Sequence, residues 1–301
     1  MKIKYPLFFL VLVLLPSLSH AQRWKRQRYE FSFGVGITNF LGELGGANQI
    51  GTNYFKDLEW SQTRFAAAVG LRYKLSNYFA LKANATYGRV SGDDALTTET
   101  FRHNRNLKFF SDIVELNINF EGAFQQEQIG HRYRLRRIKG LKGYEIYMYG
   151  FAGVGIFYFN PKTTIDGITY ELQPLGTEGQ GWIPTRTKYS RIQMCIPVGI
   201  GFKYTIDRAW GVGLELGLRK TFTDYIDDVS TTYFDFAGYN VPDAAFLDYV
   251  SDPSLHDPEA GPDPTAAGQQ RGDPRDKDSY MFAIFSINYK IKKGRSSLPR
   301  F

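Results

Sequence analysis

In several apolar stretches the charged side chains are separated by even numbers of positions, which places them on one common face of a sheet. Two of the carboxylates, Glu115 and Glu121, could in principle carry out acid–base chemistry. Cations share the same face, and an unpaired buried charge is costly, so we expect these groups to form ion pairs. The predicted charge network comprises Arg64, Arg72, Lys82, Glu115, Glu121, Lys203, Glu215 and Arg219.

Other residues with chemical potential do not form a recognisable site. The histidines are scattered and have no metal-ligand spacing: they are His20, His103, His131 and His256. The single Cys195 is expected to be a packed residue in a strand. Asp224, Asp227 and Asp228 could bind calcium, but they lack the full ligand loop, so turn hydrogen bonds are favoured. We therefore predict no catalytic residue, metal, cofactor or small-molecule substrate.

A period of two dominates the chain. In the first such stretch, Tyr29, Phe31 and Phe33 alternate with Glu30 and Ser32, so one face meets an apolar medium and the other does not. In one stretch, 144–159, both faces are apolar and the pattern leaves the register open. The predicted strands cover residues 29–38, 64–74, 79–88, 114–121, 144–159, 192–204, 210–219 and 281–290.

These strands predict an all-β fold. No segment shows a helical period, aromatic residues make up 16% of the chain, and 30 residues are glycine. A soluble β-sandwich would need shorter strands and a second sheet over each apolar face. A transmembrane antiparallel up-and-down β-barrel of about eight strands, with long extracellular loops, removes every sheet edge and is favoured.

The N-terminus indicates export. Lys2 and Lys4, the apolar run 7–15 and the small residues around Ala21 are typical of a signal peptide. A membrane-anchoring helix is the alternative, but the run is too short to span a bilayer. We expect a signal peptide over residues 1–21 and a barrel domain over 22–301, in the bacterial outer membrane with its lipids as neighbours. The net charge of +7 falls to +5 without the two lysines, and no concentrated basic face suggests nucleic acid.

The connections predict the orientation. Those at 76–77 and 207–209 are very short, whereas those at 42–62, 91–106, 160–188 and 226–278 are long. Short periplasmic turns and long outer loops are typical of bacterial barrels. An aromatic half-girdle is expected at the periplasmic rim, made of Tyr29, Tyr73, Phe79, Tyr204, Trp210 and Tyr289. Arg271-Gly272-Asp273, in the last long connection, is interpreted as a chance tripeptide.

One predicted periplasmic connection, 125–143, is long and basic. A basic excursion of this size favours a protein partner or anionic lipid head groups, and a solvated charge run remains the alternative. The candidate contact residues are Arg132, Arg134, Arg136, Arg137, Lys139 and Lys142.

Several segments resemble the PorG-like outer-membrane barrels of the Bacteroidetes type IX secretion system. The similar segments are 29–46, 150–161, 196–204, 215–230 and 270–280. The most specific run is Thr223-Asp224-Tyr225 followed, after one residue, by Asp227-Asp228-Val229-Ser230. The resemblance implies a non-enzymatic barrel of the protein transport machinery that links a periplasmic ring, built from a lipoprotein and its partner, to the outer membrane.

Two other classes compete with this interpretation. An OmpA-like structural or adhesive barrel would bind a surface ligand through its long loops. An outer-membrane hydrolase would need a nucleophile at the rim of the lumen, and the sequence offers no candidate.

Overall fold

The computed structural model describes residues 27–42, 44, 60–124, 146–206, 209–256 and 263–291. The predicted signal peptide, residues 1–21, lies outside these ranges, so its cleavage stays a prediction.

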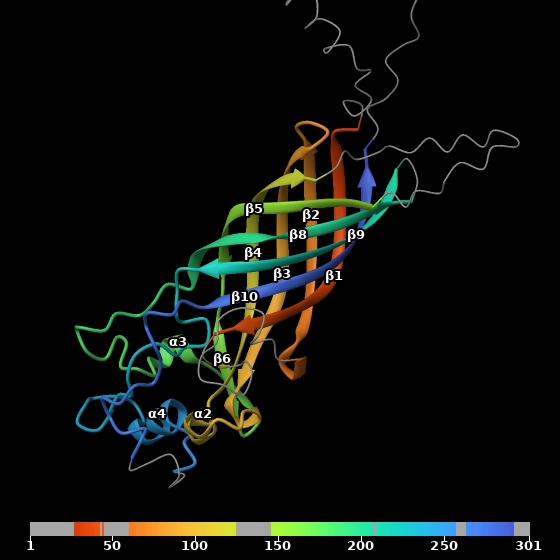
Figure 1. Ribbon diagram of the computed structural model, residues 1–301. Helices are drawn as coiled ribbons and strands as arrows, with labels where there is room; N and C mark the ends of the chain where they lie inside the picture. The colour runs from red at the N-terminus through yellow and green to blue at the C-terminus, as the bar shows by residue number, and fades with distance from the viewer. Residues whose placement is uncertain are drawn as a thin grey trace, which may run out of the picture.

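Eight antiparallel strands close into a barrel (Figure 1). Neighbours follow the order β3-β2-β1-β10-β9-β8-β5-β4, and pairing of β3 with β4 closes the ring. This confirms the predicted fold class and its eight strands. The barrel strands are β1 (Tyr29–Leu41), β2 (Arg64–Lys74), β3 (Phe79–Asp93), β4 (Lys108–Ala123), β5 (Ile146–Tyr158), β8 (Ile192–Thr205), β9 (Trp210–Thr221) and β10 (Ser279–Lys290).

The period of two corresponds to the inside and outside of the barrel. In β1, Phe31 and Phe33 are exposed while Glu30 and Ser32 are buried. The same alternation settles the register of β5, which the sequence left open. Its even-numbered residues face outward and its odd-numbered residues, including Tyr149, face the lumen.

The two ends of the barrel differ. At the turn end, β2 and β3 are joined by the tight connection 75–78, where Ser76 Oγ accepts from the backbone N–H of Phe79 at 3.0 Å. At the opposite end, the loop end, the long connections fold into further elements (Figure 1). These are two short 3-10 helices, η4 (Trp60–Gln62) and η5 (Asp94–Leu96), three helices, α2 (Thr100–Arg105), α3 (Leu172–Leu175) and α4 (Ala244–Ser251), and the hairpin of β6 (Pro161–Ile165) and β7 (Ile168–Glu171).

The structure corrects two predicted connections. Strand β3 continues to Asp93, two residues beyond the predicted start of its loop at 91. The connection 160–188 contains the β6–β7 hairpin, because β6 extends the sheet by pairing Lys162 with Phe110 of β4.

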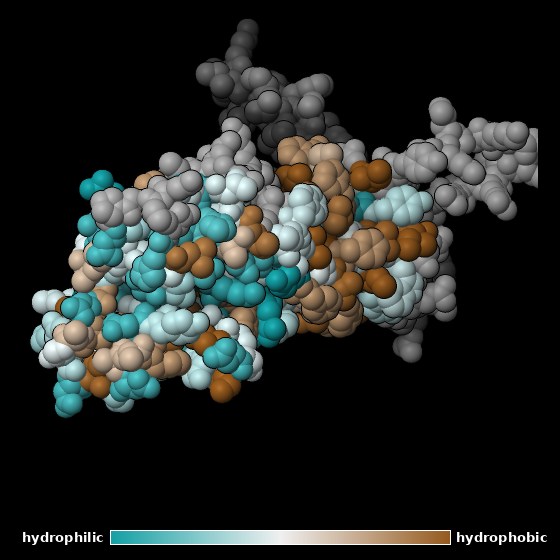
Figure 2. Space-filling view, turned by 90° about the horizontal axis from the view of Figure 1, so that it is seen from below, coloured by the Kyte–Doolittle hydropathy of each residue, from teal (hydrophilic) through white to brown (hydrophobic). Residues whose placement is uncertain are grey.

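The outer surface of the barrel is apolar. Phe33 and Val154 are 59% and 61% exposed, and similar side chains cover every barrel strand. Figure 2 shows hydrophobic residues gathered over the barrel and hydrophilic residues over the part that carries the loops. An apolar band of this extent is far larger than water-soluble monomers expose, and it fits a lipid surrounding.

Helices supply no alternative membrane crossing in the described ranges, where none is both long and apolar enough to span a bilayer.

The interior has two tiers. Toward the loop end, a hydrophobic core fills the barrel and includes Phe40, Phe109, Phe157, Tyr280 and Phe282. Toward the turn end, the interior is charged and polar.

The space inside is so narrow that glycines are required on the inner face. A Cβ at Gly199 would lie 2.1 Å from the carbonyl oxygen of Leu216. Since a contact of that length cannot be relieved without moving backbone, the lumen is a packed core at this level.

Candidate functional site

The charge network lies in the tier of the interior that is toward the turn end. Nearest the turn end, Glu30 of β1 pairs with Lys203 of β8 and, at 3.8 Å, with Arg72 of β2. Arg72 also pairs with Glu121 of β4 and donates to the hydroxyl of Tyr147 at 2.8 Å. Most of these bonds join strands that are not neighbours in the sheet, so they brace the barrel across its lumen.

Two further pairs lie closer to the middle of the barrel. Lys82 of β3 pairs with Glu215 of β9, which also accepts from the hydroxyl of Tyr149 at 2.5 Å. Arg219 of β9 donates to Glu115 of β4 at 3.3 Å. Tyr280 and Asn117 complete the surroundings of Glu115, with the Tyr280 hydroxyl at 2.7 Å and a hydrogen bond from the Asn117 amide.

This arrangement of ion pairs stabilises a closed, filled lumen. Each of the four lumen carboxylates is met by a cation, and Glu115 and Glu215 also receive tyrosine hydroxyls. The cavity beside Lys82, Glu215 and Arg219 has a volume of about 20 Å³. That volume accommodates about one water molecule, so the lumen is closely packed beside these three residues.

Seven of the eight predicted network residues meet in the lumen, and Arg64 does not. Arg64 is the first residue of β2, at the loop end, above the level of the lumen carboxylates. Its guanidinium donates to Gln62 Oε1 at 3.0 Å and to the carbonyl oxygens of Ser61 and Thr63 at 3.1 and 3.3 Å. The alternation pattern correctly places the Arg64 side chain on the inner face of β2. It does not indicate how far along the barrel axis the residue lies.

Sequence reasoning left Glu30 out of the network. It is 1% exposed and is the fourth lumen carboxylate, paired with Lys203 and Arg72. Lys74 and Lys290 are further cations buried on the inner face toward the turn end. The signal was present, because Glu30 shares the parity of Ser32 in the first alternating stretch.

The six candidate contact residues of the basic connection lie outside the described residues. Arg132, Arg134, Arg136, Arg137, Lys139 and Lys142 fall within 125–145. The adjoining strand ends, Ala123 of β4 and Ile146 of β5, lie at the turn end of the barrel.

The family motif lies over the loop end of the lumen. Ile226 and Val229 join the hydrophobic core, and the motif residues Thr223, Asp224, Asp227, Asp228 and Ser230 are buried. Tyr225 is half-buried and stacks on Tyr189, with ring centroids 4.5 Å apart.

The motif carboxylates bind backbone and hydroxyl groups. Asp227 accepts from the N–H groups of Leu44 and Val229 at 3.2 and 3.0 Å. Asp228 accepts from the hydroxyls of Thr177 and Tyr189. Within the described residues, no group of three or more His, Cys, Asp or Glu side chains is placed to hold a metal ion.

A second buried charge cluster organises this end, and we call it the cap cluster: Thr177, Glu178, Asp228, Ser230, Thr231 and Arg271. Glu178 accepts from the N–H groups of Ser230 and Thr231 at 2.8 and 3.1 Å and pairs with Arg271 at 3.1 Å. Arg271 also donates to the carbonyl oxygen of Asp228 at 2.6 Å. One arginine therefore joins two long connections over the barrel, the one between β5 and β8 and the one between β9 and β10.

Burial changes the acid–base behaviour of the cap cluster. It raises the pKa of Asp228 from 3.8 to about 6, although Arg271 and the hydroxyls of Thr177 and Tyr189 act in the opposite direction. Burial and the neighbouring Asp228 hold the pKa of Tyr189 well above its usual value, so its hydroxyl remains a donor.

Sequence reasoning missed the cap cluster. Arg271 was interpreted as part of a chance tripeptide, yet it is 4% exposed and central to the cluster. Its partners are about 40 and 90 residues away along the chain, and no periodic signal connects loops across such distances.

A family model matches most of the chain. The family model described as "Domain of unknown function (DUF6089)" matches residues 6–241. No curated protein matches the chain.

Among solved structures, the chain is similar to three bacterial surface proteins. Ail of Yersinia pestis has 7% identity and a TM-score of 0.36, with 88% of this chain and 99% of that chain covered. Neisserial surface protein A has 6% identity and a TM-score of 0.37, with coverage of 87% and 96%. OprG of Pseudomonas aeruginosa has 7% identity and a TM-score of 0.36, with coverage of 89% and 98%. The barrel itself is established by the strand pairing, and similarity at this level adds nothing on function.

Proposed function

We propose that this chain, which belongs to the family described as a domain of unknown function (DUF6089), is a non-enzymatic barrel of the bacterial outer membrane that anchors a protein assembly. The observation that carries the proposal is the braced lumen inside an apolar exterior. A barrel that is packed inside offers no route for a solute, and its lumen carboxylates are held by cations instead of facing a substrate. What remains is a rigid body fixed in lipid.

The specific assembly we propose is the type IX secretion system. The resemblance of five segments, above all residues 223–230, to PorG-like barrels supports this role. In that role the barrel would hold the periplasmic ring, made of a lipoprotein and its partner, to the outer membrane.

The partner would meet the turn end of the barrel. Short connections lie at this end and folded long connections at the other, which is the arrangement of barrels whose turns face the periplasm. The aromatic side chains support this orientation. At this rim the ring centroids of Tyr29 and Tyr73 are 5.1 Å apart, and those of Trp210 and Tyr289 are 4.7 Å apart. The basic connection 125–143 leaves the barrel here and supplies the proposed contact residues.

A pull-down tests the proposal. The tagged full chain is extracted from its native outer membrane in mild detergent, and co-purifying proteins are identified by mass spectrometry. We expect the ring lipoprotein and its partner with the wild type, and loss of both with Arg132, Arg134, Arg136 and Arg137 replaced by Ser. Unchanged recovery and unchanged cargo secretion would contradict the assigned contact.

A control variant separates the effect of losing positive charge from the effect of where on the barrel that charge lies. Replacing Lys188 and Arg275 by Ser removes exposed cations at the loop end. This variant is expected to retain the ring proteins, because its changes lie on the opposite side of the membrane.

An adhesive barrel is the second candidate, and one observation favours it. The folded loop end exposes large apolar side chains, with Phe101, Tyr249 and Leu255 at 61%, 56% and 52%. The position of the partner separates the two candidates. Recovery of surface ligands without periplasmic proteins would favour adhesion.

A further inference from the structure

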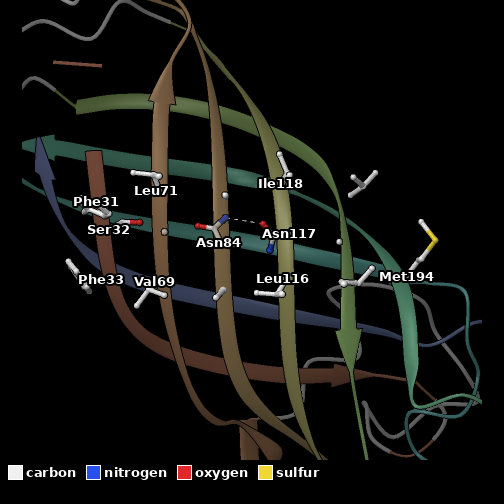
Figure 3. A pocket seen from close by; sticks show the side chains of 16 residues that line it. Phe31, Ser32, Phe33, Val69, Leu71, Asn84, Leu116, Asn117, Ile118 and Met194 are labelled. Atoms are coloured by element: carbon white, nitrogen blue, oxygen red, sulfur yellow. Dashed lines mark hydrogen bonds between the residues drawn. The ribbon is translucent and has the colours of Figure 1, made fainter. Parts of the chain in front are cut away.

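The apolar exterior is not uniform, because one face has a depression with a volume of about 780 Å³. Figure 3 shows it at mid-height across neighbouring strands, with the labelled side chains coming from β1, β2, β3, β4 and β8. Its outward-facing lining is apolar and includes Val69, Leu71, Leu116, Ile118 and Met194.

Small residues on β3 create the depression. Ala85 lies between Val69 and Leu116 on the adjacent strands, and Ala83 lies between Leu71 and Ile118. Two short side chains flanked by longer ones leave a furrow along β3. Toward the loop end, the next outward residue of β3 is Tyr87, which is 43% exposed and bounds the furrow on that side.

Cations gather where the same strands reach the loop end. They are Arg89, Lys108, Lys162 and Arg191, and we call them the cationic belt. Arg89 lies four residues beyond Ala85 on β3, about 13 Å at roughly 3.3 Å per residue. Lys108 is the first residue of β4, and Lys162 of β6 lies opposite Phe110 of the same strand. Arg191 directly precedes β8 and contacts Tyr158 of β5.

The belt retains donors for a ligand. Arg89 uses two of its five N–H groups on Asp112, at 2.7 and 3.2 Å, and remains 45% exposed. Lys108 pairs with Asp93 at 3.0 Å and is 64% exposed. Three acidic side chains, Asp93, Asp112 and Glu171, accompany the four cations, so the belt carries an excess of one positive charge.

We infer that the depression and the cationic belt together bind a phosphorylated lipid of the outer leaflet, with its acyl chains in the furrow and its phosphate at Arg89 and Lys162. This inference rests on the proposed placement in the outer membrane. The charged belt lies beyond the furrow toward the loop end, at the ends of β3 and β4 and in the adjoining β6 and the residue before β8. This is the order in which chain and head group follow one another in a lipid. Guanidinium and ammonium groups are the side chains that bind phosphate best.

A second copy of this chain fits the surface less well. A two-fold contact across the furrow would bring the belts of both copies together. Like charges facing one another weaken such an interface.

Lipid retention tests the inference. The full chain is purified in mild detergent, stripped of lipid, and titrated with lipid A, which carries two phosphates, and with its fully dephosphorylated form. We expect the phosphorylated lipid to bind about tenfold more tightly, and Arg89→Gln with Lys162→Gln to remove most of that difference, at roughly one kcal/mol per cation near a membrane surface. Ala85→Leu, which fills the furrow, should weaken both lipids.

Two matched variants serve as controls. Lys220→Gln removes an exposed cation from the outer face of β9, away from the furrow, and Ala67→Leu enlarges an outward alanine of β2 that does not line it. Both should bind like the wild type. Equal affinity for the two lipids, or equal losses in Lys220→Gln, would overturn the inference.

Fractionation separates this result from failure of the proposed function. A chain found in the outer membrane that binds both lipids equally loses only the lipid site. A chain absent from the outer membrane contradicts both.

Discussion

The lumen and the cap cluster both bury charges, yet they use them in opposite ways. In the lumen, Lys82 and Glu215 project from strands whose positions are already set by backbone ladders. In the cap cluster, Glu178 and Arg271 bind the backbone of loops that no strand ladder holds, where the neighbouring pairing is an isolated bridge between Thr232 and Gln270. Ion pairs in the first region follow from the backbone arrangement, whereas in the second they maintain it.

This difference determines what a mutation should do. A charge lost from the lumen lowers stability but leaves the strand register intact. A charge lost from the cap cluster releases loop conformation while the barrel persists.

The largest effect is expected in the lumen. Lys82→Met leaves Glu215, whose side chain is 18% exposed and lies beside Tyr149, without its paired cation. We expect a loss of about 3–5 kcal/mol in unfolding free energy. Urea unfolding in lipid vesicles measures it. Adding Glu215→Leu should restore most of the loss, since an apolar pair can replace a buried ion pair. A double variant as unstable as the single one would show that the pair acts through something other than charge.

The cap cluster comes next. Glu178→Gln removes the negative charge that pairs with buried Arg271. We expect the free energy that keeps the loop end folded to fall by about 3 kcal/mol. Limited proteolysis should cut within residues 222–280 while the barrel core stays resistant. Glu171→Gln, which breaks an exposed pair with Arg191, is the control and should change little. Simultaneous loss of barrel and cap would contradict the contrast.

The third effect depends on pH. The pKa of Asp228 is raised to about 6 in the folded cap, so the folded state binds this proton more tightly than the unfolded state. Its stabilising contribution is complete below pH 3.8 and is lost as the pH rises through about 6. We expect closure to weaken by on the order of 2–3 kcal/mol between pH 4 and 7.

Hydrogen exchange of the loop-end amides across this pH range measures the change. Asp228→Asn cannot titrate and should flatten the profile. A profile that keeps its slope in this variant would assign the titration to another group.

The smallest effect is expected at Arg64. It binds carbonyl groups at the rim and no lumen carboxylate, so Arg64→Gln should cost less than about 1 kcal/mol. Urea unfolding again measures it. A loss as large as that of Lys82→Met would return Arg64 to the network.

The sequence predicted the barrel because side-chain alternation is a local property. Residues as far apart as Glu115 and Arg219 were assigned to one interior from parity alone, and they meet there. Parity does not encode height, so Arg64 was included wrongly. The hydrophobic tier toward the loop end was missed because Phe40, Phe109 and Tyr280 lie beyond the ends of the predicted strands.

The loop end could not be predicted in the same way. Glu178 and Arg271 are 93 residues apart, and each lies in a connection without a period. The motif 223–230 was found through resemblance alone, and its burial over the lumen emerged only from the structure.

Closure of the barrel has a consequence for biogenesis. Strand β1 pairs with β10 over its whole length, from Glu30 opposite Lys290 to Leu41 opposite Ser279. The first strand therefore has an open edge until the last strand has been synthesised and delivered. Until then both edges can pair with any extended chain they meet. The polypeptide must therefore be kept from other chains during export, and β1 and β10 should pair only at the membrane.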